Sequence, residues 1–232
     1  MNKSLMTGIG IGVVVAALAA GFGADDDARR TISAMAVSPD EETLALGAAD
    51  GSISFLHINQ DGTFGRPERV PGVHVGRVNA LAYRVDGSEV LSVGDDGTVG
   101  RTGTDPPVRH RPLAAAEPAL GPLVSMAHYR EKGKLGELLA VGAENGQLRL
   151  WELRSEPPRE RGRIAKAGSA GISLYELRFS PDGETLAATT AATVSLWRTS
   201  DLHPIDTTSI AHDANKDIRS LDFSPDGRLL AT

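Results

Sequence analysis

The chain has 232 residues, a formal net charge of −6, 26 Gly, 13 Pro and no Cys. Its length indicates one domain or at most two, and a hydrophobic content of 41% is enough for a buried core. The acidic balance offers no general attraction to nucleic-acid phosphates, and the lack of Cys excludes disulfides, thiolate zinc sites and a cysteine nucleophile. Aromatic residues make up only 4% of the chain, which counts against surfaces that stack sugars or bases.

The first element in chain order is an apolar segment, residues 1–24. Lys3 is its only charged residue, residues 4–24 are uncharged, and the acidic run Asp25–Asp27 ends it. A basic start, an apolar stretch and small residues near the end are typical of a secretory signal. The uncharged run is also long enough to cross a bilayer as a helix, with the N-terminus in the cytoplasm.

Both interpretations predict a hydrophobic N-terminal helix, as a signal peptide or a membrane anchor. Both also place residues 25–232 outside the cytoplasm, in a periplasmic, secreted or membrane-anchored protein. A third interpretation, a buried strand pair, is less favoured because residues 1–24 do not match the repeats that follow.

A four-residue turn motif then recurs along residues 25–232. Neighbouring copies are 44 to 50 residues apart: Ser38-Pro39-Asp40-Glu41, Arg84-Val85-Asp86-Gly87, Arg130-Glu131-Lys132-Gly133, Ser180-Pro181-Asp182-Gly183 and Ser224-Pro225-Asp226-Gly227. A second turn repeats in step with the first: Ala49-Asp50-Gly51, Asp95-Asp96-Gly97, Glu144-Asn145-Gly146 and a degenerate Ala191-Ala192. Self-similarity at a fixed period indicates a repeat architecture.

The segments between these turns predict short β-strands, because apolar and polar residues alternate with a period of two between hairpin turns. Predicted first strands are 32–37, 78–83, 124–129, 174–179 and 218–223, and second strands are 44–48, 90–94, 138–143 and 186–189. Third strands include 147–151 and 193–197, and weaker fourth strands are 66–70, 108–113, 161–164 and 203–207. Pro residues in the fourth strands fit an outer sheet edge.

Four antiparallel strands in each unit of about 45 residues resemble a blade of the WD-repeat β-propeller family. The resemblance rests on the two kinds of turn, on His74 before the strand at Val78, and on Trp151 and Trp197. It covers residues 31–232 and implies an all-β fold of four-stranded antiparallel blades.

Four units are complete, and part of a fifth begins at Ile218. Propellers need about 4–8 blades, and WD-repeat rings commonly need more than are visible here. We therefore expect residues 25–232 to form a partial WD-repeat propeller, an incomplete ring of four blades plus part of a fifth, as a fragment of a longer product or the product of a truncated gene.

The resemblance also implies a hydrogen-bonded network of His, Ser or Thr, Asp and Trp in each blade. The second unit has His74, Ser92 and Asp96, but Thr102 stands in place of the Trp. The other units are less complete. The first has Asp50 but Leu56 at the Trp position, the third has Trp151 but Asn145 at the Asp position, and the fourth has Trp197 but Ala191 at the Asp position. This departure affects the expected rigidity of the blades more than their identity.

No catalytic, cofactor-binding or metal-binding residue is predicted. The six His residues lack metal-ligand spacing, and no nucleophile elbow, phosphate-binding loop or metalloprotease helix is present. The preferred function is a non-enzymatic scaffold for a protein partner, with no cofactor, small-molecule substrate or nucleic acid. The alternatives are a propeller enzyme with its active site at the central channel, or the sensory region of a larger membrane protein with another domain beyond residue 232.

A candidate partner-binding surface follows from the family geometry, which puts the loop before the first strand and the second turn on one rim. Its candidate residues are Arg77, Asp95 and Glu144, three charges at loop tips, where function tends to concentrate. We expect charge reversal there to weaken partner binding and to change stability by no more than about 0.5 kcal/mol. The competing interpretation is that they are ordinary solvated turn residues.

Overall fold

The computed structural model describes residues 31–105, 108–113, 120–130, 136–165, 173–190, 193–205, 218 and 220–232. The regular elements of these residues are all β-strands. Among them there is accordingly no helix of the length and apolarity that a membrane crossing requires. The predicted N-terminal helix, as a signal or an anchor in residues 1–24, lies outside the described residues.

Three sheets each contain four antiparallel strands in chain order. The first sheet comprises β1 (Ile32–Val37), β2 (Thr43–Ala48), β3 (Ile53–His57) and β4 (Glu68–Val70). The second comprises β5 (Val78–Tyr83), β6 (Glu89–Gly94), β7 (Val99–Gly103) and β8 (His110–Pro112). The third comprises β9 (Leu123–Arg130), β10 (Glu137–Ala143), β11 (Leu148–Glu152) and β12 (Arg159–Ile164). The predicted all-β fold with four-stranded antiparallel sheets is confirmed in these three units.

The last two sheets are smaller among the described residues. The fourth contains β13 (Glu176–Phe179), β14 (Thr185–Thr189) and β15 (Val194–Arg198), and the fifth contains β16 (Asp222–Phe223) and β17 (Leu230–Ala231). Of the strand predicted at 203–207, residues 203–205 are described, and they pair with β15 through a bridge between Trp197 and Pro204 and through hydrogen bonds from the Arg198 N–H to His203 and from the Ile205 N–H to Leu196. Proline has no N–H to donate, but its two neighbours make the bonds to β15, so Pro204 is tolerated on this outer strand.

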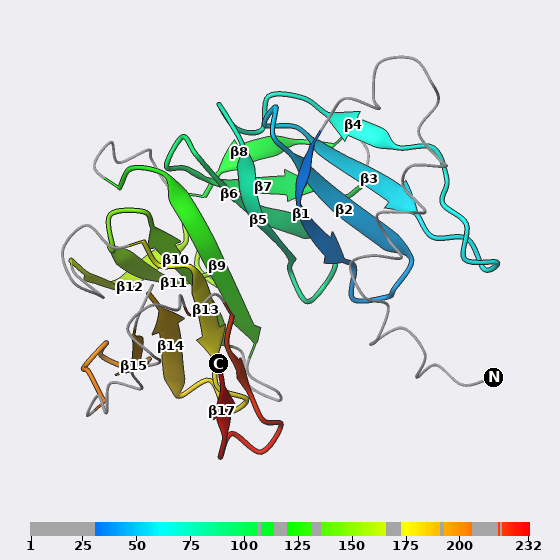
Figure 1. The fold of residues 1–232 in the computed structure, drawn as a ribbon. Helices are drawn as coiled ribbons and strands as arrows, with labels where there is room; N and C mark the ends of the chain where they lie inside the picture. Colours follow the sequence, from blue (N-terminus) through cyan, green and yellow to red (C-terminus); the bar gives the residue numbers. More distant parts are fainter. Residues whose placement is uncertain are drawn as a thin grey trace.

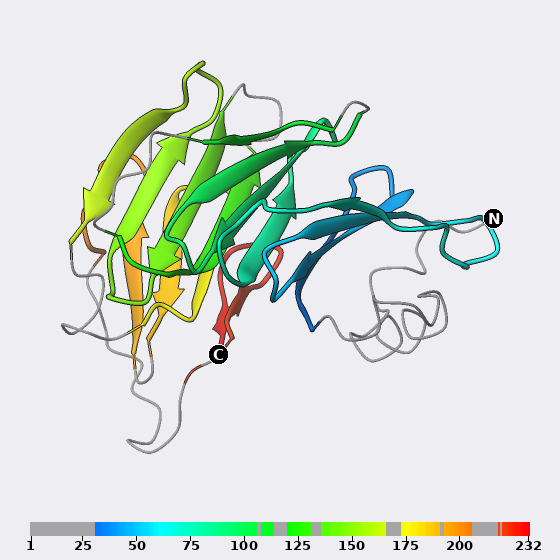
Figure 2. The same cartoon turned by 90° about the horizontal axis from the view of Figure 1, so that it is seen from above.

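The sheets follow one another as an open arc (Figures 1 and 2). The first strands of neighbouring sheets contact each other, from β1 to β5, β9 and β13. They form the inner edge of the arc, and β4, β8 and β12 are the fourth strands of their sheets, at the opposite edge. Within the described residues the arc does not close into a ring.

Most of the hydrophobic core of the described residues lies between neighbouring sheets, and a smaller cluster of Leu44, Leu46 and Leu56 belongs to the first sheet alone. One cluster joins the first and second sheets through Ile53, Phe55 and Val78, for example. Space there is tight, because a Cβ atom on Gly47 of β2 would lie 2.6 Å from Cγ1 of Val78. Small residues in the second strands therefore allow neighbouring sheets to approach closely.

The Ser-Pro-Asp-Gly turns have a repeated hydrogen-bond pattern. In the fourth unit the Ser180 hydroxyl donates to Asp182 Oδ1 at 2.5 Å, and it accepts the Thr185 N–H at 2.9 Å. Asp182 Oδ1 also accepts the Glu184 N–H at 3.0 Å. The turns that begin at Ser38 and Ser224 repeat all three bonds. The motif thus satisfies the backbone of its own hairpin, which explains why it recurs in the first, fourth and fifth units.

Polar side chains connect the first strands along the inner edge. Ser33 Oγ donates to the carbonyl oxygen of Val78 at 2.6 Å, and Asn79 Nδ2 donates to that of Leu123 at 2.8 Å. Ser125 Oγ donates to the carbonyl oxygen of Leu174 at 2.7 Å. Each bond runs from one unit to the start of the next, so the same connection is made three times.

A chain of ion pairs also links the second and third sheets. Glu137 accepts from Arg84 through both carboxylate oxygens, at 3.2 and 2.5 Å, and its Oε1 lies 2.8 Å from His128 Nε2. Arg84 continues to Glu89 at 3.3 Å, and Glu89 accepts from the buried Arg101 at 2.7 Å. The two sheets therefore share a largely buried polar contact beside their apolar one.

Candidate functional site

His74 lies in the loop that leads into β5, and it joins this loop to the β6–β7 turn. Its Nδ1 is 3.0 Å from Asp96 Oδ1, and its Nε2 is 2.8 Å from Ser92 Oγ. Asp96 also accepts the N–H groups of Val75 and Thr98, at 2.8 and 3.0 Å. The structure thus brings His74, Ser92 and Asp96 together in the second unit.

The electrostatics of Asp96 define the direction of these bonds. Burial would raise the pKa of Asp96, but hydrogen bonds from the Val75 N–H and from Thr98 keep it below its usual value. An ionised carboxylate only accepts, so the bond at Nδ1 requires a proton on that nitrogen. In neutral His74, Nε2 then accepts from the Ser92 hydroxyl.

The order Ser92–His74–Asp96 is that of a nucleophilic triad, but its surroundings do not suit catalysis. Ser92 is completely buried and His74 is 3% exposed. Gly100 packs so closely that a Cβ atom there would lie 2.6 Å from Ser92 Oγ. A substrate carbonyl cannot reach this hydroxyl, so the arrangement supports the loop rather than hydrolysis.

His110 is a further neighbour of this network, which the sequence did not indicate. It comes from β8, and its Nδ1 lies 3.2 Å from the hydroxyl of the buried Thr102. Its ring packs edge-on to His74, with 6.4 Å between the ring centroids. Burial, together with the neighbouring His74, lowers the pKa of His110, which favours a neutral ring. Thr102 and His110 thus meet where the family pattern has a Trp on the third strand.

The two Trp residues predicted for the blade networks lie on the third strands of the third and fourth sheets, β11 and β15. Trp151 packs in the core between the second and third sheets, with Leu91 and Leu139 in the same cluster. Trp197 belongs to the cluster between the third and fourth sheets. Both are at least 95% buried, so their main structural contribution is apolar packing between sheets.

The three candidate partner-binding residues are all exposed. Arg77 precedes β5, whereas Asp95 and Glu144 follow β6 and β10, so the antiparallel order places them at the same end of their sheets. Backbone hydrogen bonds at 3.1 Å and 2.9 Å join Asp95 to Arg77 and Glu144 to Pro122. We call residues 75–77, 95–97 and 144–146 the Arg77 rim.

The Asp95 side chain is held in this rim by hydrogen bonds, unlike that of an ordinary solvated turn residue. Its Oδ2 accepts the Arg77 N–H at 3.1 Å, and its Oδ1 accepts from Asn79 Nδ2 at 2.8 Å. Asn79 also donates to Leu123, in the next unit. Because reversal of Asp95 would break these bonds at a cost of about 1 kcal/mol, the expected limit of about 0.5 kcal/mol applies only to Arg77 and Glu144.

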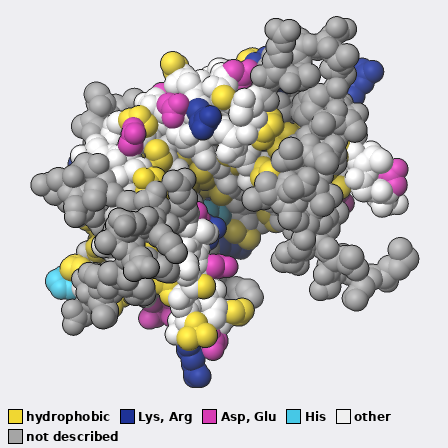
Figure 3. Space-filling model, viewed as in Figure 1, with side chains coloured by type: hydrophobic (Ala, Val, Ile, Leu, Met, Phe, Trp, Pro, Cys, Tyr) yellow, Lys and Arg dark blue, Asp and Glu magenta, His cyan; other side chains and the backbone are white. Residues whose placement is uncertain are grey.

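The surface charge elsewhere is mixed. In Figure 3 the positive and negative side chains of the described residues are scattered over the visible face, without a broad patch of one sign. Among the described residues, no group of three or more His, Asp or Glu side chains is placed to hold a metal ion.

Repeated antiparallel sheets, joined in an arc by their first strands, define a propeller-like β-repeat protein. A family model described as "WD domain, G-beta repeat" (WD40) matches residues 205–232, which include β16, β17 and the Ser224 turn between them. Together the match and the sheets support a WD-repeat, propeller-like family, and this suggests a scaffold for protein interactions. A search of curated proteins found no match.

Proposed function

We propose that this protein is a non-enzymatic scaffold that binds a protein partner through the Arg77 rim, and that it acts outside the cytoplasm. The observation that carries the first proposal is the rim itself, where three exposed charges stand on a hydrogen-bonded backbone. The bonds continue from Arg77 through Asp95 and Asn79 to Leu123, and Glu144 is held to Pro122 beside it.

A rigid rim suits recognition because a partner does not need to order it on binding. The rim carries charges of both signs, which favours a partner of complementary pattern over a uniformly charged surface. Val75, which is 83% exposed beside Arg77, adds an apolar contact to this surface. These features together favour another folded protein as the ligand.

Reversing two rim charges in the Arg77→Glu/Glu144→Lys variant is expected to lower partner capture at least about tenfold. The fold should remain, with unfolding free energy within about 0.5 kcal/mol of the wild type, because both side chains are exposed. The measurement is a quantitative pull-down from envelope extracts with the full 232-residue chain.

The matched control is Arg66→Glu/Glu68→Lys, which makes the same exchange at residues beside and within β4 of the first sheet. It should retain every protein that the wild type captures. A rim variant that still captures these proteins, or a control that loses them equally, would contradict the proposed surface.

The extracytoplasmic location is supported by the single positive charge and the uncharged run of residues 1–24. Alkaline phosphatase fused after Thr232 is expected to be active in cells, because this enzyme requires export. The same fusion without residues 1–24 should be inactive. High activity of the shortened fusion, or no activity of the full one despite normal expression, would refute the role of this segment.

A further inference from the structure

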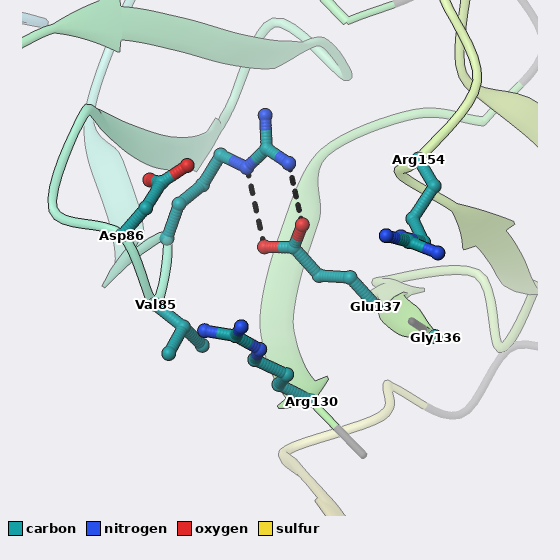
Figure 4. A pocket seen from close by; sticks show the side chains of 7 residues that line it. Val85, Asp86, Arg130, Gly136, Glu137 and Arg154 are labelled. Atoms are coloured by element: carbon teal, nitrogen blue, oxygen red, sulfur yellow. Dashed lines mark hydrogen bonds and ion pairs between the residues drawn. The ribbon is translucent and has the colours of Figure 1, made fainter. Parts of the chain in front are cut away.

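A cavity of about 350 Å³ opens at the strand ends that lie opposite the Arg77 rim. Arg84 and Asp86 contribute to it after the end of β5, Arg130 at the end of β9, Glu137 at the start of β10 and Arg154 after β11 (Figure 4). We call it the Arg130 cavity. Among the described residues of its lining, Val85 is the one large apolar side chain, so these residues offer an apolar ligand little contact.

The two acidic residues of the Arg130 cavity already accept hydrogen bonds from other residues of the chain. Glu137 accepts from Arg84 through both oxygens and also contacts His128. Asp86 accepts the N–H and hydroxyl of Ser88, at 3.0 and 2.6 Å. Glu137 therefore matches the positive charge of Arg84, whereas the hydrogen bonds of Asp86 come from a neutral residue and leave its negative charge in place.

Arg130 and Arg154 are the available cations of this cavity. Both are exposed, and neither has an ion pair with another residue of the described chain. Figure 4 places them on either side of Glu137. With three arginines and two acids, the lining carries a formal charge of +1, although the chain as a whole carries −6.

We propose that the Arg130 cavity binds a phosphoryl group, held by Arg130 and Arg154. A guanidinium group presents paired N–H donors that match the oxygens of phosphate. A phosphoryl group directs three terminal oxygens to different sides, so it can accept from two arginines that approach from different directions. A carboxylate has two oxygens in one plane and uses such an arrangement less fully. The volume leaves space for a small group esterified to the phosphate.

Isothermal titration of the full chain with inorganic phosphate tests this site. Saturable binding is expected, weakened by added NaCl because the arginines are exposed. The Arg130→Gln/Arg154→Gln variant should bind at least tenfold more weakly. The control, Arg66→Gln/Arg228→Gln, removes two charges in the first and fifth units and should bind as the wild type does. Circular dichroism would verify that both variants are folded.

Two further titrations identify the source of the phosphoryl group and its selectivity. Tighter binding of phosphoserine than of inorganic phosphate would support a phosphate ester as the ligand, and the reverse order would support free phosphate. Acetate should bind at least tenfold more weakly than either. Acetate binding of equal strength, no saturable phosphate binding, or unchanged binding by the folded double-arginine variant would each overturn the proposal.

Discussion

Replacing Glu137 with glutamine is expected to lower the free energy of unfolding by about 3 kcal/mol, because it removes the buried carboxylate that pairs with Arg84 and leaves Arg84 only its longer contact with Glu89, at 3.3 Å. Glu137 is 8% exposed and accepts two hydrogen bonds from Arg84 and one from His128. The amide of glutamine has a single acceptor oxygen and no charge. Urea denaturation at neutral pH measures the loss, provided that the transition keeps the wild-type slope.

Glu156→Gln is the matched control for this variant. Glu156 also pairs with a buried arginine, Arg101, at 2.7 Å, but its own side chain is 58% exposed. Exposed ion pairs contribute about 0–1 kcal/mol, so the control should lose much less stability than Glu137→Gln. Equal losses in the two variants would show that burial of the Glu137 pair does not determine its contribution.

The stability difference between the wild type and Glu137→Gln is also expected to depend on pH. Burial would raise the pKa of Glu137, but hydrogen bonds from His128 and Arg84 lower it from 4.5 to about 2. A folded-state pKa below the unfolded one stabilises the fold above the unfolded value, and this contribution is lost as pH falls towards the folded value. The stability difference between wild type and Glu137→Gln should therefore be constant above about pH 5 and shrink towards about pH 2. A difference that stays constant to about pH 3 would contradict the ion-pair explanation.

The second large loss of stability is expected from Gly51→Ala, in the turn between β2 and β3. Gly51 has a φ of +79°, and a Cβ atom there would lie 2.0 Å from the carbonyl oxygen of His74. The Gly51 carbonyl also accepts the His74 N–H at 3.0 Å, so the two backbones cannot separate without losing this bond. We expect a loss of at least about 3 kcal/mol, the sum of backbone strain and a forced displacement.

Gly62→Ala separates these two contributions. Gly62 has nearly the same φ, +81°, but a Cβ atom added to it would meet nothing within 4 Å. This variant should lose only the cost of the left-handed backbone, about 1 kcal/mol. Thermal unfolding of both variants gives the comparison, and similar losses would show that the His74 loop yields to a methyl group at Gly51 without cost.

Most strands could be predicted because their determinants are local. The hairpin turns satisfy their own backbone with side chains only two to five residues away, as Ser180 and Asp182 do. The alternating pattern therefore had defined ends, and β1 and β5 begin and end at the predicted residues. The strand predicted at 203–207 is described only as far as Ile205, where a bridge at Pro204 and backbone hydrogen bonds on either side pair it with β15.

Interactions between units were much less accessible from the sequence. Arg84 and Glu137 are 53 positions apart, and the turn motif that begins at Arg84 does not indicate this pair. His110 meets Thr102 only because of the register between β7 and β8. By contrast, His74, Ser92 and Asp96 could be grouped because each holds a defined place in the family pattern. The hydrogen bonds that hold Asp95 depend on the position of Asn79 and could not be inferred from its turn alone.

The inner-edge hydrogen bonds have a mechanical consequence. Ser33, Asn79 and Ser125 each anchor one first strand to the next through a directional bond to a backbone carbonyl. The apolar contacts between the sheets have no such directionality and permit small sliding movements. If neighbouring sheets rock against each other, we therefore expect the inner edge to be the pivot, with displacement growing with distance from it. A partner bound to the Arg77 rim, next to the first and second strands, would contact residues that are expected to move little. The fourth strands β4, β8 and β12 are expected to show the largest displacements.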